Sequence, residues 1–274
     1  MRRAAKALWQ AVFGAAPSAT AQRMGLAIYT RKVERDAAYR EWSERFGGAR
    51  LAGHYGHYTV EDTFAIEHLK SQLYELTTTL RRRLGPLPAA TRALDAGASD
   101  GLFLEVLGIR RGVGLNIMPE CARNVAKDGY AACRADLGAL PFRSGAFDVA
   151  ICCETLEHLP DPIQGLRELG RVCRGRICVS VPWVARTRIT GPAPGGHRPD
   201  RQHVFEFDRK DFTAVAALAG LETVHHEVVR VFPGARNPAV ELMFRETLYR
   251  AYFPWLHYFE LAATKPPNGR AARA

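Results

Sequence analysis

Residues 94–101 read LDAGASDG, and this stretch decides the fold. An apolar run that ends at Ala96 leads into a turn containing Gly97 and Gly101, and the apolar segment 102–107 follows at once. The pattern predicts a strand, a tight turn and a helix. Because this turn has little side-chain bulk, a ligand can approach the backbone N–H groups at the start of the helix. Ligands of open parallel sheets bind at such strand ends.

Short apolar runs separated by helix-like segments continue beyond this turn. Such alternation is typical of an α/β fold in which a mostly parallel sheet carries helices on both faces. We expect the final strand to be antiparallel. The seven predicted strands are residues 92–96, 112–117, 131–135, 147–153, 177–181, 222–231 and 258–263.

The first 88 residues have a different pattern and predict a helical N-terminal extension. A helix is expected over residues 60–83, where apolar side chains recur near helical spacing, and Gly85 to Pro88 closes the extension. The α/β domain then covers residues 89–265. It contains an insert at about 232–256, with a predicted helix at 240–252, that would act as a lid. Residues 266–274 form a tail.

Composition narrows the class of protein. No stretch approaches the roughly 20 apolar residues that a membrane-spanning helix needs. The six cysteines form no Cys-x-x-Cys pair, which favours a reducing compartment and argues against zinc. We therefore expect a cytoplasmic protein without a transmembrane segment. The net charge of +10 attracts phosphates, but scattered arginines are equally typical of a solvated surface.

The turn after the first strand resembles motif I of class I S-adenosylmethionine-dependent methyltransferases, which have a Rossmann-like fold. In that family an acidic residue and a Gly-x-Gly-x-Gly turn hold the methionyl part of the cofactor. Asp95, Gly97 and Gly101 match this motif, and Ser99 replaces the middle glycine. The resemblance implies that all four residues bind S-adenosylmethionine.

The same resemblance assigns the remaining cofactor contacts. Asn116 ends the second predicted strand, where the family usually presents an acidic residue to the ribose hydroxyls. Residues 135–149, ADLGALPFRSGAFDV, resemble the third and fourth motifs in order and spacing. Asp136 would then accept a hydrogen bond from the adenine amino group. Leu137 and Cys153 are expected beside the cofactor.

Residues 152–162, CCETLEHLPDP, follow the fourth strand, at the edge where the methyl group would point. If this stretch is helical, Glu154, Glu157 and His158 share one face. The segment resembles coenzyme Q O-methyltransferases and small-RNA 2′-O-methyltransferases. In the RNA enzymes a later histidine completes the metal site, and His203 is the candidate here. These four residues would bind Mg²⁺ or Mn²⁺.

The same segment also occurs in metal-free members of the wider family. His158 or His203, with Glu154 nearby, could then act in catalysis as a general base without a metal. His225 and His226 lie in a predicted strand and are interpreted as structural. His54 and His57, together with Tyr55 and Tyr58, could line a substrate pocket or belong to a surface loop.

These features predict an enzyme that methylates a hydroxyl of a small molecule or glycan with S-adenosylmethionine. One alternative is a metal-dependent RNA 2′-O-methyltransferase; nucleic acid is less favoured because no RNA-binding module accompanies the catalytic domain. Another is a non-catalytic protein that binds the cofactor. A third is an enzyme that attaches to membrane surfaces through Trp9 and Phe13. The sequence leaves the oligomeric state open.

Overall fold

The computed structural model describes residues 37–46, 63–189, 203–230 and 254–264. These residues belong to two compact units, which we describe separately. Residues up to Leu76 belong to the first unit, and residues 77–230 and 254–264 belong to the second. The predicted helix at 240–252, the four aromatic residues at 54–58, and Trp9 and Phe13 lie outside the described residues.

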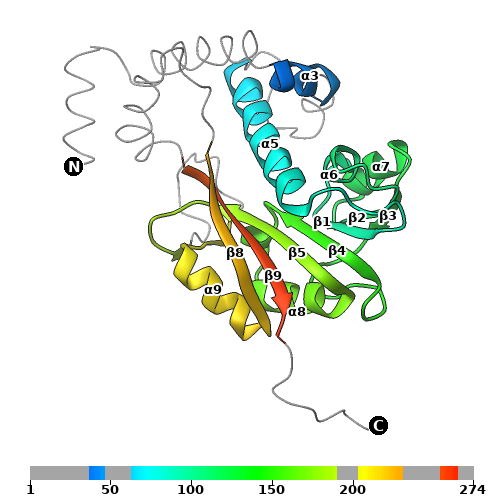
Figure 1. Ribbon diagram of the computed structural model, residues 1–274. Helices are drawn as coiled ribbons and strands as arrows, with labels where there is room; N and C mark the ends of the chain where they lie inside the picture. Colours follow the sequence, from blue (N-terminus) through cyan, green and yellow to red (C-terminus); the bar gives the residue numbers. More distant parts are fainter. Residues whose placement is uncertain (1–36, 47–62, 190–202, 231–253, 265–274) are drawn as a thin grey trace, which may run out of the picture. The chain divides into compact units, whose positions relative to one another are not determined.

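The second unit contains a seven-stranded sheet in the order β3-β2-β1-β4-β5-β9-β8, as Figure 1 shows from the β3 edge to the β8 edge. The first five strands in this order run parallel, whereas β9 pairs antiparallel with both β5 and β8. This confirms the mostly parallel sheet and the antiparallel final strand. The strands are β1 Arg92–Ala96, β2 Arg111–Asn116, β3 Ala131–Arg134, β4 Phe147–Cys153, β5 Cys173–Pro182, β8 Leu221–Arg230 and β9 Pro254–Ala263.

Helices pack against this sheet. α7 contacts β2 and β3, α8 contacts β5, and α9 contacts β8. Asp161 caps α8, because its carboxylate accepts a hydrogen bond from the Gln164 N–H at 2.9 Å. Asp208 caps α9 in the same way. The helices of this unit are α6 Leu102–Val106, α7 Pro119–Lys127, α8 Pro162–Val172 and α9 Arg209–Leu218, with a 3₁₀ turn, η1, at Leu156–His158.

The core lies between the sheet and these helices. It includes apolar side chains of β4 and β5, both strands being buried through most of their length, together with side chains of α8, α9 and β9. Such continuous apolar strands are expected where a parallel sheet is covered by helices. Phe212 of α9 stacks on Phe259 of β9 with ring centroids 4.2 Å apart, which anchors the helix on the antiparallel part of the sheet.

The structure corrects several predicted boundaries. β5 begins at Cys173 and β9 at Pro254, four residues before the predicted starts. The polar residues Arg174 and Arg176 interrupt the apolar pattern at the start of β5, which is why the sequence hid it. A second sheet of two short strands, β6 Arg188–Ile189 and β7 Phe205–Glu206, was not predicted.

The first unit contains α3, Ala37–Phe46, and the start of α5, Thr63–Leu84, which continues into the second unit. Aromatic side chains hold these two helices together. The ring of Tyr74 lies edge-on to Tyr39 and Trp42, with centroids 5.1 and 5.8 Å away. No helix in the described part of the chain is both long enough and apolar enough to cross a membrane.

Candidate active site

The turn after β1 is held in a conformation that requires glycine at two positions. Gly97 and Gly101 have φ values of 92° and 81°, in the left-handed region. A Cβ at Gly97 would lie 2.0 Å from the Thr155 hydroxyl oxygen. The Gly97 and Ala98 N–H groups both donate to the Leu115 carbonyl of β2. The turn therefore presents bare backbone between β2 and the segment that follows β4.

Asp95 lies at the end of β1 with 2% of its surface exposed. Its Oδ2 atom is buried and has no hydrogen-bond partner within the described residues. Burial, reinforced by the charge of Asp100, raises the pKa of Asp95 to about 8. A buried carboxylate oxygen without a partner is costly, and a cationic ligand would relieve that cost. This observation fits a cofactor with an ammonium group and a sulfonium centre.

Ser99 and Asp100 complete the turn. The Asp100 carboxylate accepts hydrogen bonds from the Leu102 N–H at 3.0 Å and from the Ser99 hydroxyl at 3.4 Å. Asp100 therefore holds the turn against the first residue of α6, and Ser99, the residue that departs from the family motif, takes part in this bracing.

Asn116, predicted to meet the ribose, lies at the end of β2. Its side-chain NH₂ donates to the Ala98 carbonyl at 3.0 Å, and its Oδ1 accepts from the Met118 N–H at 2.9 Å. The amide thus connects the turn after β1 to the start of α7. An aspartate could not donate the first of these hydrogen bonds.

The segment after β3 carries Asp136 and Leu137. Asp136 is exposed and its Oδ1 accepts from the Gly138 N–H at 2.7 Å, whereas Leu137 is buried in the core. Arg171 of α8 fixes the segment by donating to the carbonyls of Leu140 and Phe142 at 2.9 and 2.6 Å. Asp136 is therefore presented at the carboxyl edge of the sheet on a braced loop.

Cys153, the last residue of β4, and Glu154, which follows it, differ in their roles. Cys153 is buried, and burial raises the pKa of its thiol well above the ordinary value, so it remains a neutral thiol. Glu154 has a φ of 51°, which is rare for a residue with a side chain. Its N–H donates to the Ser180 carbonyl, and its Oε1 accepts from the Ser180 hydroxyl at 3.1 Å.

The left-handed backbone at Glu154 shows that the prediction of one shared helical face is wrong for this residue. Only Leu156–His158 form a helical turn, and Glu154 precedes it. Glu154 is therefore not among the three residues whose ligand atoms converge, although it is near Glu157, and its carboxylate accepts a hydrogen bond from Ser180 of β5. Burial raises the pKa of Glu154 to about 8.

Glu157, His158 and His203 form a cluster: ligand atoms of the three side chains all lie within 4.8 Å of one another. The imidazoles of His158 and His203 meet edge to face, with centroids 4.8 Å apart. The Val204 N–H donates to the Glu157 carbonyl at 2.7 Å, which ties the segment of His203 to η1. Residues 45 positions apart are thereby brought together.

Glu157 is the most unusual member of the cluster. Its side chain is completely buried, and neither carboxylate oxygen has a hydrogen-bond partner in the described part of the chain. Burial and the nearby charges of Glu154 and Glu206 raise its pKa well above the ordinary value. A buried carboxylate of this kind is stable either as the neutral acid or beside a cation.

His203 has a second carboxylate partner. Its Nδ1 lies 3.1 Å from Oε1 of Glu206, which is 2% exposed and also forms an ion pair with Arg188. Burial opposes ionisation of Glu206, but hydrogen bonds from Arg188 and His203 outweigh it and lower the pKa. An ionised Glu206 would accept from the Nδ1–H of His203, so that Nε2 carries the lone pair.

Sequence reasoning missed two residues of this site. Thr155 packs on Gly97 and donates its hydroxyl hydrogen bond to the Cys153 carbonyl at 2.9 Å. Glu206 orients His203. The spacing of three residues between His203 and Glu206 could have indicated the pair. Glu206 was missed because β7, the strand that contains it, was not predicted.

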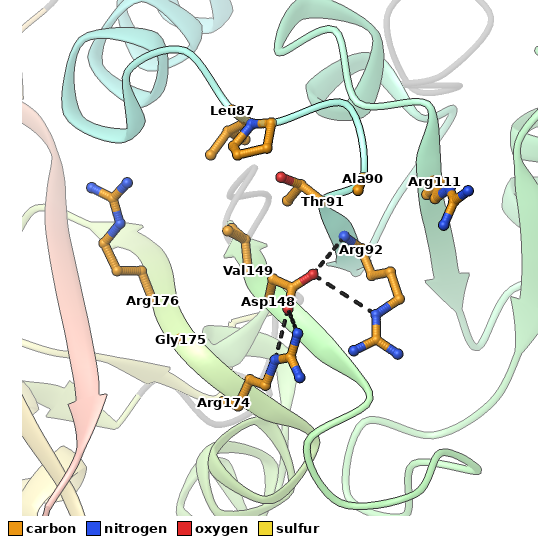
Figure 2. A pocket seen from close by; sticks show the side chains of 11 residues that line it. Leu87, Ala90, Thr91, Arg92, Arg111, Asp148, Val149, Arg174, Gly175 and Arg176 are labelled. Carbon is orange, nitrogen blue, oxygen red and sulfur yellow. Dashed lines mark hydrogen bonds and ion pairs between the residues drawn. The ribbon is translucent and has the colours of Figure 1, made fainter.

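A separate cavity of about 670 Å³ lies at the other end of the strands (Figure 2). Asp148, at the start of β4, accepts hydrogen bonds there from the Arg92 N–H at 2.9 Å and from Arg174 Nε at 2.7 Å. Arg176 donates to the carbonyls of Arg83 and Leu84 at the end of α5. These arginines hold the starts of the strands and the end of α5 together. We therefore assign Asp148 a structural role.

Comparisons with known proteins agree with this geometry. The family model "Methyltransferase domain" matches residues 66–226. A curated relative, 27-O-demethylrifamycin SV methyltransferase of Amycolatopsis mediterranei, is 28% identical over 239 residues, with 71% of this chain and 85% of the relative covered.

Solved structures share the fold at low sequence identity. A Burkholderia thailandensis 1,6-didemethyltoxoflavin-N1-methyltransferase with bound S-adenosylhomocysteine aligns with a TM-score of 0.52 at 18% identity, covering 84% of this chain and 92% of its own. Magnesium protoporphyrin IX methyltransferase of Synechocystis PCC 6803, with bound S-adenosylmethionine, gives 0.52 at 14% identity, with coverages of 86% and 95%.

The sheet order, the glycine turn after β1 and these matches define the class of protein as a Rossmann-like methyltransferase. The chain belongs to the methyltransferase domain family, among the class I S-adenosylmethionine-dependent methyltransferases.

Proposed function

We propose that this methyltransferase transfers the methyl group of S-adenosylmethionine to a hydroxyl oxygen of a small molecule or glycan. The observation that carries the proposal is the pairing of His203 with the buried Glu206, because it creates a general base next to the segment after β4. The relative from Amycolatopsis mediterranei, 27-O-demethylrifamycin SV methyltransferase, is named for an O-demethyl substrate, which supports an oxygen acceptor.

The residues at the carboxyl edge of β1 to β3 would hold the cofactor. Gly97 and Gly101 allow the left-handed backbone of the turn. Oδ2 of Asp95, which has no hydrogen-bond partner within the described residues, would meet the cationic end of the cofactor. Ser99 and Asn116 support the turn, whereas Asp136 would receive the adenine amino group. Leu137 and Cys153 supply apolar surface.

S-adenosylmethionine supplies a methyl group that is already activated on sulfonium. What remains for the protein is to align the acceptor and to remove one proton. His203, held by Glu206 in the tautomer with a lone pair on Nε2, would take the hydroxyl proton as the oxygen bonds to the methyl carbon. His158, beside His203, would help to hold this imidazole in place or act as the base in its stead.

A divalent cation is the second candidate for activating the hydroxyl. The two oxygens of Glu157 have no hydrogen-bond partner within the described residues and, with His158 and His203 beside them, form a donor set that suits Mg²⁺ less well than Mn²⁺. When bound, such an ion lowers the pKa of an oxygen that it coordinates. Glu154 would take part from the Ser180 side only after its side chain moved.

The experiment is a methyl-transfer assay with isotopically labelled S-adenosylmethionine. The acceptors are phenols, catechols, sugars and a short RNA, each tested with Mn²⁺, with Mg²⁺ and with a chelator. The His203→Gln variant should lose about 10²-fold or more in rate. His225→Gln, on the edge strand β8, is the matched control and should retain the wild-type rate.

Each outcome separates one alternative. Methyl transfer to RNA and to no other acceptor would show that the protein is an RNA 2′-O-methyltransferase and would contradict our proposal. Cofactor binding without transfer to any acceptor would favour the non-catalytic protein. An undiminished rate in His203→Gln would remove the general-base assignment, and a rate that disappears with the chelator would favour the metal.

A further inference from the structure

A second hollow lies at the same edge of the sheet as the cofactor site. It has a volume of about 680 Å³ and is lined by residues that follow β5, by the start of α9 and by His257 of β9. Because β9 is antiparallel to β5, the first residues of β9 lie beside the last of β5, and His257 pairs with Val181. The hollow therefore opens where the parallel strands end.

This hollow is connected to the reacting end of the cofactor site through neighbouring strands. β4 and β5 are adjacent, and strands of a sheet lie about 5 Å apart. Ser180 of β5 hydrogen-bonds to Glu154 through both its carbonyl and its hydroxyl. Trp183 follows three residues later and lines the hollow. The hollow and the segment after β4 therefore both lie at the carboxyl ends of adjacent strands.

The charge of the hollow is positive on one side. Arg209 and Lys210 are the first residues of α9, so their side chains add to the positive end of the helix dipole. Neither side chain forms an ion pair with any residue that the structure describes. Asp208, the one acidic residue among the described lining residues, is occupied as the helix cap, since its two oxygens accept from the N–H groups of Asp211 and Thr187.

His257 supplies an independent sign of a ligand. It is 4% exposed, and its Nε2 atom is buried without a hydrogen-bond partner of normal geometry in the described residues. Its Nδ1 lies 3.0 Å from Nε2 of His226, so one ring must donate to the other. Burial lowers the pKa of both imidazoles, that of His226 to about 4, and the pair is neutral at pH 7.

The hollow also offers an aromatic surface. The rings of Trp183 and His257 are tilted by 35°, with centroids 6.2 Å apart. Indole and imidazole faces suit a flat, apolar body better than a sugar, and the two cations suit an anionic substituent on it. Together these contacts describe one type of small molecule.

We infer that this hollow is the methyl-acceptor site and selects an aromatic acceptor that carries an anionic group. Arg209 and Lys210 bind the anionic group, Trp183 packs on the ring, and Nε2 of His257 hydrogen-bonds to a polar substituent. This inference rests on the proposed function, which it narrows from any hydroxyl compound to an anionic aromatic one.

The test is a calorimetric titration of the full chain, first with S-adenosylhomocysteine and then with three probes: salicylate, phenyl phosphate and the neutral salicylamide. We expect salicylate or phenyl phosphate to bind, which would identify carboxylate or phosphate as the preferred anion. Salicylamide should bind about tenfold more weakly or worse, because it cannot form the charged contacts. Equal binding of salicylamide, or binding of no probe, would overturn the inference.

Variants localise the effect. Arg209→Gln combined with Lys210→Gln should weaken the anionic probes by about tenfold or more, whereas Lys127→Gln, at the exposed end of α7, should not. His257→Asn removes the buried Nε2 and should also weaken binding. If His257→Asn fails to fold, the double variant, whose two side chains are exposed, still tests the inference. Unchanged probe affinity in the double variant would contradict the inference.

The cofactor titration separates the two proposals. S-adenosylhomocysteine should bind the wild type and the double variant with equal affinity, because neither residue is in the cofactor turn. Absence of S-adenosylhomocysteine binding by the wild type would count against the proposed function. Normal cofactor binding with no effect of the two basic residues on the probes would count against the acceptor site alone.

Discussion

A Cβ at Gly97 would lie 2.0 Å from Oγ1 of Thr155, so the turn after β1 and the segment after β4 fit together only because residue 97 has no side chain. The same glycine has a φ of 92°, which other residues rarely adopt. Residue 97 is therefore restricted to glycine both by its backbone conformation and by its contact with Thr155.

The substitution Gly97→Ala should lower the free energy of unfolding by about 2–4 kcal/mol, through backbone strain and the clash with Thr155. Gly129→Ala is the matched control, since Gly129 has a φ of 83° but nothing within 4 Å of its Cβ position. It should cost only about 1 kcal/mol. Urea unfolding measures both, and equal losses would show that the clash with Thr155 is absent.

Asn116 is expected to be required as an amide. The substitution Asn116→Asp places a carboxylate against the Ala98 carbonyl and removes the hydrogen bond from its NH₂ group. At pH 7 the free energy of unfolding should fall by about 1–3 kcal/mol. Part of the loss should be recovered at pH 4, where a protonated carboxyl can donate again. A variant as stable as the wild type at pH 7 would disprove the bracing role.

Asp95 should make the ligand-free protein less stable as the pH rises. Its pKa is about 8 in the folded state, above the ordinary value near 4 of the unfolded chain, so the folded state retains a proton that the unfolded state has lost. The contribution is fully present below pH 4 and is lost as the pH rises to 8. Asp95→Asn should reduce the slope of stability against pH by up to about 1.4 kcal/mol per unit.

Asp148→Asn is the control of opposite sign. The pKa of Asp148 is lowered, first by the hydrogen bond from the Arg92 N–H and further by Arg174. Its contribution is therefore present above the ordinary pKa and lost as the pH falls. The control should change the curve at acidic pH and leave the interval from pH 5 to 8 as in the wild type. If Asp95→Asn also left that interval unchanged, the carboxyl would be ionised in the folded state.

Glu157→Gln should have opposite effects with and without a metal ion. In the metal-free protein at pH 8, a neutral amide replaces a buried carboxyl whose pKa is raised, so the melting temperature should rise. Mn²⁺ should stabilise the wild type, and this shift should disappear in the variant. Glu120→Gln, on the exposed side of α7, is the control. An equal Mn²⁺ shift in Glu157→Gln would exclude this carboxylate as a ligand.

Much of the fold could be predicted because the central strands β1 and β4 are buried along nearly their whole length and appear in the sequence as plain apolar runs. The turn after β1 could also be predicted from the sequence, because its left-handed positions, Gly97 and Gly101, are occupied by glycine. The start of β5 could not be predicted in this way, because Arg174 and Arg176 break the apolar pattern at the amino end of the strand. They hydrogen-bond to Asp148 and to the end of α5.

The reacting end of the site was predicted only in part. Spacing indicated that Glu157 and His158 act together, and the resemblance supplied His203. No local pattern reports the left-handed backbone of Glu154, which depends on a hydrogen bond to Ser180 in another strand. The pair of His226 and His257 is likewise a contact between β8 and β9, so it exists only in the folded sheet.

The central claim, that the turn after β1 binds the cofactor, is tested most directly by calorimetric titration with S-adenosylhomocysteine. The wild type should bind one equivalent, Gly129→Ala should bind equally well, and Asp95→Asn should bind more weakly while remaining folded by circular dichroism. Absence of binding by the folded wild type, or unchanged affinity in Asp95→Asn, would contradict the claim.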